Sequence, residues 1–240
     1  MTVYLQPTGP TAEIALLPGD PKRAMELANR VMVAPRMSNL SRGLWGYHGE
    51  TPLGRELTVQ STGIGGPSAA IVAHELAELG VREAVRIGTC VALSEGPAIG
   101  STVLVSGAIG GTRAIGAASD PEPRADEGLS ALLGRSLPEA AGPMAVAEIE
   151  LYYDRDSARR RSEWTGAGAR VADLSTAGLL AAGADLGIAI ASVLIVSEDD
   201  GGERLPDEEL DAALLGLGEN VAEALLGERS AQSSETASRD

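Results

Sequence analysis

The sequence predicts an α/β fold, a single domain with a mixed, largely parallel central sheet flanked by helices. Apolar runs of strand length alternate along the chain with helical patterns, and this order favours parallel strands joined by helical connections. The 240 residues, of which 44% are hydrophobic, suffice to bury one sizeable core. We expect this domain to span residues 1–227. Residues 228–240 are polar and offer nothing to bury, which predicts a disordered tail.

Strands are expected where β-branched and other apolar residues form short runs between turn-forming residues. The first run ends at the turn Pro18-Gly19-Asp20-Pro21, and an alanine-rich stretch that favours a helix follows this turn. Six runs have the composition of strands, namely residues 14–17, 57–62, 84–87, 102–106, 144–149 and 189–196.

Helices are expected at residues 68–79, 175–184 and 206–226. Ser68 stands where an N-cap residue would begin the first of them. The third has an apolar stripe with acidic residues on the opposite side, as in a helix that covers a core with one face. The stripe consists of Leu210, Leu214, Leu217, Val221 and Leu225.

The composition restricts the classes of partner. A formal net charge of -15 predicts repulsion from nucleic acid and from an anionic membrane surface, so neither is an expected partner. No apolar run approaches 20 residues and the N-terminus has no signal-peptide pattern, so we expect neither membrane spanning nor secretion. The one cysteine, Cys90, cannot form an intrachain disulfide and suits a reducing cytoplasm, the expected location. No metal site is predicted, because His48 and His74 are too far apart to form a ligand motif.

Three arginines stand at the ends of predicted strands and loops. Arg23 follows the Pro18 to Pro21 turn, where glycine lets backbone N–H groups approach an anion. Arg42 lies in the segment Ser41-Arg42-Gly43, and Arg86 lies near the end of a strand expected to be buried. A buried arginine is costly without an anionic partner, and that partner can be a bound anion or an internal carboxylate. The pattern indicates a phosphate site, although an ordinary turn with a solvated arginine would explain Arg23 equally well.

Three motifs resemble those of one family, the nucleoside phosphorylases of the purine and uridine phosphorylase superfamily. They are Leu17-Pro18-Gly19-Asp20-Pro21 with Arg23, the segment Ser61-Thr62-Gly63-Ile64-Gly65-Gly66-Pro67-Ser68, and Arg86-Ile87-Gly88-Thr89-Cys90. The resemblance extends from about Leu5 to Leu226. It implies a nucleoside-phosphorylase-like fold with a barrel-like distortion of the sheet, and an assembly into homodimers or into hexamers built as trimers of dimers. It also implies a phosphate site made by Gly19, Arg23, Arg42, Arg86 and Thr89, with Arg42 shared across subunits.

The resemblance also assigns a base site. The run Val193 to Glu198 resembles the strand that in purine-cleaving members ends in Ser-Asp, where the aspartate donates a proton to the purine. Glu198 takes that position here and is the candidate catalytic acid, while Tyr152 is the candidate for stacking on the base. A run of three acids at a strand end is also typical of a solvated loop. The Gln-x-Arg pair of the uridine enzymes is not evident after Tyr153, which makes uridine a less favoured substrate.

The sugar site departs from the family pattern. Members carry Glu-Met-Glu or Asp-Met-Glu before a helix, and the last glutamate grips the ribose hydroxyls. This chain has Asp173, Leu174 and Ser175 there, so a serine replaces that glutamate and can instead cap the helix. Tyr4 stands near the place of the histidine that family members lend to the neighbouring ribose. Asp173, Leu174, Ser175 and Tyr4 are the candidate sugar-binding residues.

Three functions therefore compete. The first is a nucleoside phosphorylase, a pentosyltransferase that cleaves a purine-type or atypical nucleoside with inorganic phosphate as co-substrate and needs no cofactor. The second is a noncatalytic nucleoside-binding homologue, which the replaced ribose glutamate favours. The third is a hydrolytic nucleosidase, against which Arg23 and Arg86 count. Gly63-Ile64-Gly65-Gly66 does not indicate a dinucleotide site, because the next strand ends in Arg86-Ile87-Gly88-Thr89 and not in an acidic residue.

Overall fold

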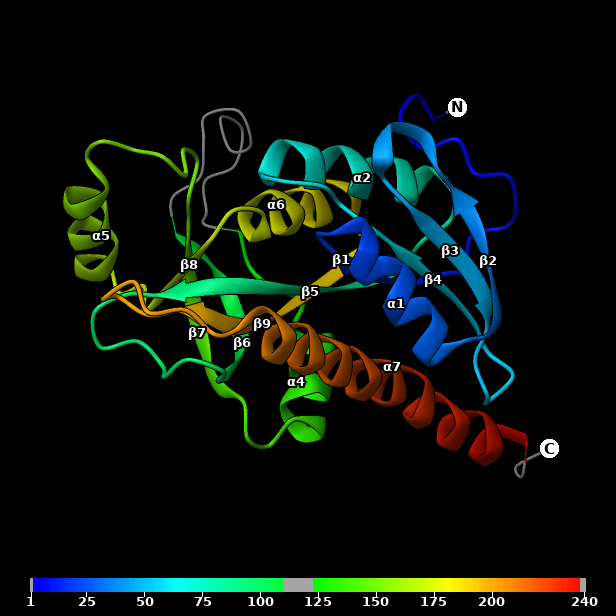
Figure 1. Cartoon of the computed structure of the whole chain (residues 1–240). Helices are drawn as coiled ribbons and strands as arrows, with labels where there is room; N and C mark the ends of the chain where they lie inside the picture. The colour runs from blue at the N-terminus through cyan, green and yellow to red at the C-terminus, as the bar shows by residue number, and fades with distance from the viewer. Residues whose placement is uncertain (1, 110–122, 238–240) are drawn as a thin grey trace.

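The computed structural model describes residues 2–109 and 123–237. Within these residues a mixed sheet of nine strands is flanked by helices, as the sequence predicts (Figure 1). The order across the sheet is β2-β3-β4-β1-β5-β8-β7-β6-β9. The strands are β1 (Ile14–Pro18), β2 (Val33–Asn39), β3 (Gly46–Glu50), β4 (Glu56–Gln60), β5 (Glu83–Ala92), β6 (Thr102–Ile109), β7 (Ala141–Glu148), β8 (Val171–Asp173) and β9 (Ala189–Glu198).

Half of the sheet closes on itself. β9 pairs in parallel with β5 along almost its whole length and in antiparallel with β6, while β8 and β7 complete the connection from β5 to β6. The strands β5, β8, β7, β6 and β9 therefore form a ring, which is the barrel-like distortion that the resemblance implies. The other half is open and ends at the antiparallel strands β3 and β2.

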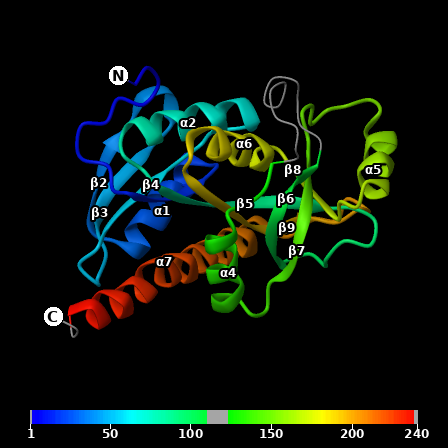
Figure 2. The same ribbon diagram turned by 180° about the vertical axis from the view of Figure 1, so that it is seen from behind.

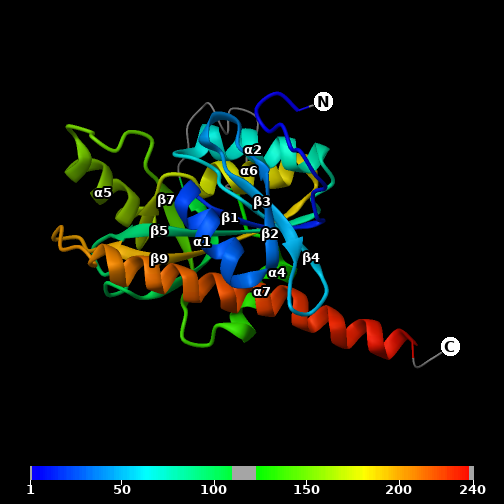
Figure 3. The same ribbon diagram turned by 45° about the vertical axis from the view of Figure 1, so that its right-hand side comes forward.

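Helices cover both faces of the sheet. Helices α2 and α6 pack together on one face, whereas α1, α4 and α7 lie on the other (Figures 1 and 2). Helix α5 lies at the opposite end of the molecule from the C-terminus (Figure 3). No helix in the described ranges combines the length and hydrophobicity needed to cross a lipid bilayer. The helices are α1 (Pro21–Val31), α2 (Gly66–Glu78), α4 (Glu127–Ser136), α5 (Ser157–Gly166), α6 (Thr176–Leu186), α7 (Asp207–Ala237) and the 3-10 turn η1 (Ser41–Gly43).

Strand β1 divides the core in two because its side chains alternate between the faces of the sheet. Ile14 and Leu16 pack with residues of α1, α4 and α7, whereas Ala15 and Leu17 pack with residues of α2 and α6. All five residues of the stripe predicted on α7 are buried in the first of these clusters. Helix α7 continues to Ala237, beyond the end of that stripe, and the disordered tail expected from residue 228 stays a prediction.

All six predicted strands and all three predicted helices are present, with most ends shifted by a few residues and with α7 ending at Ala237 instead of residue 226. The sequence interpretation missed β2, β3, β8, α4 and α5. β2 is an edge strand that contains a proline, β8 has three residues, and α5 is polar with no buried residue, so none carries a strong apolar period. The predicted cap at Ser68 is wrong. Gly65 is the N-cap residue of α2, and Ser68 lies inside the helix, where its hydroxyl donates to the Thr62 carbonyl at 2.7 Å.

Candidate active site

A cavity of about 460 Å³ opens where β1, β5 and β9 end and the loops after them meet. Its wall includes every residue that the resemblance assigns to phosphate, namely Gly19, Arg23, Arg42, Arg86 and Thr89. It also includes the candidates for base and sugar except Tyr4, namely Tyr152, Glu198, Asp173, Leu174 and Ser175. The fold therefore brings ten of the eleven candidate residues, spread over most of the chain, to one cavity.

Arg86 is the most constrained of these residues, since only 5% of it is exposed. Its Nε and Nη2 donate to Oδ2 of Asp173 at 3.1 and 2.8 Å, and Nε also donates to Thr176 Oγ1 at 3.2 Å. The internal carboxylate considered as its partner is thus Asp173. Nη1, however, is buried and has no hydrogen-bond partner within the described part of the chain. It lies 4.0 Å from the position that a Cβ atom on Gly19 would occupy. One guanidinium nitrogen is therefore left over beside the Gly19 loop, with two N–H groups available to an anion.

Gly88 makes room for this arrangement. A Cβ atom at Gly88 would stand 2.8 Å from both Cζ and Nη2 of Arg86, and 3.1 Å from Cδ2 of Leu194. A side chain at this position would push the guanidinium away from Asp173. The glycine two residues after Arg86 thus allows the arginine to fold back along its own strand.

The turn between β1 and α1 presents backbone and Arg23 to the cavity. Asp20 caps α1, since its Oδ1 accepts from the Arg23 amide at 3.0 Å, and Pro21 begins the helix with a φ that suits its first turn. The Arg23 guanidinium is oriented by Asp211 of α7, with Nε 3.0 Å from Oδ1. Nε is thus the Arg23 nitrogen that contacts Asp211, and the guanidinium has four further N–H donors on its two outer nitrogens.

The glycine loop before α2 is joined to this turn by backbone hydrogen bonds. The Thr62 amide donates to the Pro18 carbonyl at 2.9 Å, and the Gly63 amide donates to the Gly19 carbonyl at 3.0 Å. Gly63 and Gly65 have φ values of 73° and 87°, a region that favours glycine. Both line the cavity, so backbone and not side chain forms this part of its wall.

The N-terminal segment supports Arg42 from outside the cavity. The Arg42 guanidinium carbon lies 4.9 Å from the centre of the Tyr4 ring, a cation–π contact. Tyr4 is in turn held by the buried carboxylate of Glu75, which accepts from the amides of Val3, Tyr4 and Leu5 at 2.7, 2.9 and 2.5 Å. Tyr4 thus touches a cavity residue and does not itself line the described cavity. Arg42 lines the cavity of its own chain, and its sharing across subunits stays a prediction.

The two adjacent tyrosines differ in their surroundings. Tyr152 is 50% exposed and lines the cavity, whereas Tyr153 is 95% exposed and packs only edge-on against the Tyr152 ring. The position of Tyr152 is consistent with stacking against a flat ring inside the cavity.

The three consecutive acids at the end of β9 have different surroundings. Glu198 ends β9 and lines the cavity, with its Oε2 3.6 Å from Nε of Arg204. Asp199 instead accepts from the Glu203 amide at 2.9 Å within the turn, and Asp200 pairs with Arg161 at 3.2 Å. The solvated-loop interpretation thus describes the second and third acids better than the first.

The residues assigned to the sugar include one that is already engaged. Asp173 is 3% exposed and has both oxygens occupied, since Oδ2 accepts from Arg86 and Oδ1 accepts from the Thr176 amide at 3.1 Å. Ser175 is the N-cap residue of α6 by position, but its side chain makes no capping hydrogen bond, and Asp173 caps the helix instead. Leu174 and Ser175 line the cavity.

A buried carboxyl group, Glu148, lies beside this site and was not noticed in the sequence. It ends β7 opposite Asp173 in β8, is 4% exposed, and has an Oε2 without a partner within the described residues. Burial, followed by the negative charge of Asp173, raises its pKa from 4.5 to about 8, although the Gly178 amide donates to it. The signal for it was a glutamate at the end of an apolar strand.

Comparison with known families gives a direct assignment, because residues 13–227 match the phosphorylase superfamily. The chain belongs to the phosphorylase superfamily. Its relatives include DeoD-type purine nucleoside phosphorylases of Clostridium novyi and Geobacillus kaustophilus, each 31% identical to it. These two matches cover 78% and 80% of this chain and 82% and 83% of the relatives. The DeoD-type enzyme of Oceanobacillus iheyensis is 39% identical over 101 residues, which span 42% of this chain and 43% of the relative.

The superfamily motifs were visible in the sequence, but the residues that orient them were not. Asp211 orients Arg23, Arg204 lies against Glu198, and Thr176 contacts Arg86. Asp211 and Thr176 are far along the chain from the residues that they contact, and Arg204 follows Glu198 after the turn at the end of β9. No group of three His, Cys, Asp or Glu side chains in residues 2–109 and 123–237 is arranged to hold a metal ion.

Proposed function

We propose that this protein is a nucleoside phosphorylase, a pentosyltransferase that cleaves the N-glycosidic bond of a purine-type nucleoside with inorganic phosphate. The observation that carries the proposal is the buried Nη1 of Arg86, which lacks a partner within the described chain and lies beside the Gly19 loop. A donor of this kind calls for an anionic acceptor in the cavity. The names of the relatives, purine nucleoside phosphorylases, support the same substrate class.

The phosphate would lie between Arg86 and Arg23. Arg86 donates from the floor of the cavity and Arg23 from the start of α1, while the Gly19 backbone and Thr89 complete the contacts from the turn and from β5. Arg42 closes the site from the side of Tyr4. Concentrating positive charge in this way keeps the anion bound on a chain with a net charge of -15.

The sugar would lie beside Leu174 and Ser175, and the base against Tyr152 and Glu198. A phosphate oxygen attacks C1′ of the sugar as the bond from C1′ to N9 breaks, and the electron pair of that bond remains on the base. Glu198 donates its proton to N7 of the purine, so the base leaves as a neutral molecule and the sugar leaves as its 1-phosphate. Arg204 lies close enough to hold the Glu198 carboxylate after the transfer.

The protein is proposed to work as a homo-oligomer, a dimer or a hexamer, in the cytoplasm. In this proposal Arg42 and Tyr4 together form the part of the surface that a neighbouring subunit would contact. Measuring the mass in solution by light scattering, for wild type and Arg42→Ala, tests the assembly separately from the chemistry.

The direct test is release of free base from inosine and adenosine, with and without inorganic phosphate. Arg23→Ala is the informative variant, because Arg86→Ala would leave Asp173 buried without its partner and destabilise the fold. Losing hydrogen bonds worth about 1.5–3 kcal/mol from Arg23 to the anion should raise the KM for phosphate by about 10- to 150-fold.

Arg30→Ala is a matched control. Arg30 lies two turns further along α1 and also pairs with an acid of α7, with its Nε 3.1 Å from Glu219, but it does not line the cavity. Both variants lose an ion pair between α1 and α7, and only Arg23→Ala should change the KM. Base release at the same rate with and without inorganic phosphate would indicate a nucleosidase. Nucleoside binding without any release would indicate the noncatalytic homologue that the serine at position 175 favours.

A further inference from the structure

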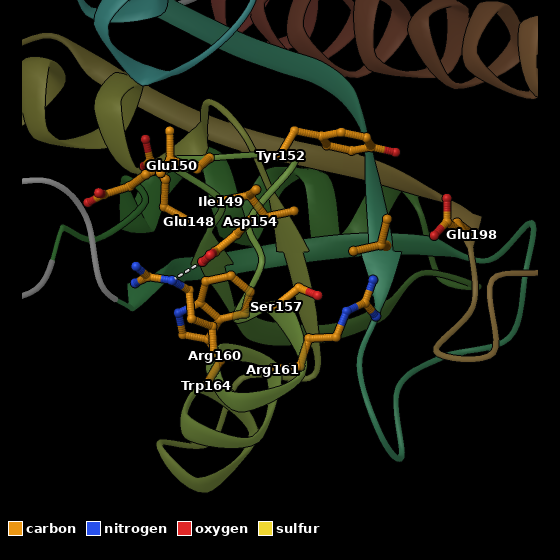
Figure 4. A pocket seen from close by; sticks show the side chains of 12 residues that line it. Glu148, Ile149, Glu150, Tyr152, Asp154, Ser157, Arg160, Arg161, Trp164 and Glu198 are labelled. Carbon is orange, nitrogen blue, oxygen red and sulfur yellow. Dashed lines mark hydrogen bonds and ion pairs between the residues drawn. The ribbon is translucent and has the colours of Figure 1, made fainter.

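A second cavity of about 390 Å³ adjoins the first one. Figure 4 shows it between the residues that follow β7 and the side chains of α5. The two cavities share four wall residues, namely Val91, Ile149, Tyr152 and Glu198. The candidate catalytic acid and the candidate stacking residue therefore face both spaces, so a molecule bound beside them can extend from one into the other.

The far wall of the second cavity comes from α5. Ser157, Arg160, Arg161 and Trp164 lie on the side of this helix that lines it (Figure 4). Trp164 is half-buried and adds a flat apolar surface at the end away from Tyr152. Helix α5 has no buried residue, although its Trp164 packs against the small core cluster of Leu93, Ala147, Ala169 and Ala172. Its polar face forms a wall of a ligand-sized space.

Both arginines of this wall are already paired with carboxylates. Arg160 pairs with Asp154, and Arg161 donates to Asp200 at 3.2 Å and to the Ala92 carbonyl at 3.5 Å. Four carboxyl groups line the cavity against two arginines, so an anionic group would enter without a surplus of positive charge to meet it. The wall suits an uncharged group that is partly aromatic.

Purine geometry connects this cavity to the proposed reaction. N7 and the substituent at C6 lie on the same edge of a purine, so a base whose N7 faces Glu198 directs its C6 substituent toward the same wall. Glu198 borders both cavities. We infer that the second cavity receives an uncharged, ring-containing substituent at C6 of the nucleobase, packed against Trp164. This inference rests on the proposed function and specifies its substrate class.

The test compares phosphorolysis of adenosine, N6-benzyladenosine and N6-succinyladenosine. The wild-type kcat/KM for the benzyl compound should lie within about 10-fold of that for adenosine, and the succinyl compound, with two carboxylates, should be at least 10-fold worse than the benzyl one. Trp164→Ala should lower kcat/KM for the benzyl compound at least 10-fold and change that for adenosine less than 3-fold. Arg159→Ala, which changes an exposed residue of α5 outside both cavities, is the matched control and should change neither.

Ser157→Trp provides a second variant if Trp164→Ala does not fold. It adds bulk to the wall of the second cavity and should also lower kcat/KM for the benzyl compound selectively. Cleavage of adenosine with at least 100-fold weaker cleavage of the benzyl compound overturns the inference and leaves the proposed function intact, as does a Trp164 or Ser157 variant that affects both substrates equally. Equal cleavage of N6-succinyladenosine and N6-benzyladenosine overturns the inference that the substituent is uncharged. Cleavage of none of the three overturns the inference, and the proposed function is overturned with it if inosine is not cleaved either.

Discussion

Replacing Glu148 by glutamine should make the protein more stable at alkaline pH. The carboxyl group is buried at the end of β7, next to Asp173, and these surroundings raise its pKa from 4.5 to about 8. The folded protein therefore keeps a proton that the unfolded chain releases near pH 4.5. Between pH 4.5 and about 8 the folded state binds more protons, so its stability falls as the pH rises. Below pH 4.5 the Glu148 carboxyl group does not change the pH dependence of stability, and above about pH 8 its full destabilising effect is reached.

The magnitude follows from the two pKa values. At about 1.4 kcal/mol for each pH unit, the difference between 4.5 and about 8 corresponds to a loss of at most about 5 kcal/mol. Since Glu148 is 4% exposed, solvent screening reduces this little. Glutamine has nearly the same shape and no ionisation, and its amide can still accept from the Gly178 amide. The variant should therefore keep its stability as the pH rises through this range.

Denaturant unfolding of wild type and Glu148→Gln at pH 5, 7 and 9 measures this difference. The free energy of unfolding of the variant minus that of wild type should increase by several kcal/mol from pH 5 to pH 9. Glu139→Gln, which changes an exposed glutamate, should give a curve parallel to wild type. Parallel curves for Glu148→Gln as well would refute the reasoning, because Glu148 would then ionise alike in both states.

Two further substitutions test the supports of the site. Gly88→Ala places a methyl group 2.8 Å from the Arg86 guanidinium and should lower the free energy of unfolding by about 1–3 kcal/mol, measured by denaturant unfolding; an unchanged value would mean that Arg86 moves aside freely. Glu75→Gln removes the charge that holds the N-terminal amides and should cost about 2 kcal/mol of stability. It should also speed hydrogen exchange of the amide of Tyr4 and weaken the Tyr4 contact with Arg42, whereas exchange at the wild-type rate would contradict the role assigned to Glu75.

The order of strands and helices was largely predictable because it depends on local periodicity. The run from Ile14 to Leu17 is apolar throughout and is buried throughout. The stripe on α7 recurs at helical spacing, and it is buried on one face of the sheet. Of the missed strands, β2 lies at an edge and β8 has three residues, so neighbouring strands and not their own side chains hold these two in place. The motifs around Gly19 and Arg86 were likewise recognisable, because the residue types and spacing of each motif lie within a few positions.

The sequence by itself determined the fold class and the family, and it predicted a set of phosphate and nucleoside residues, of which the fold brings all but Tyr4 to one cavity. The tertiary structure alone decided what each of them does with its neighbours. Arg86 and Asp173 are 87 positions apart, so their ion pair, and the one guanidinium nitrogen that it leaves over, arise only when β5 and β8 are placed side by side. The same holds for Glu148, whose proton depends on burial beside Asp173. Burial and charge pairing are properties of spatial neighbours, and the linear order of residues does not specify those neighbours.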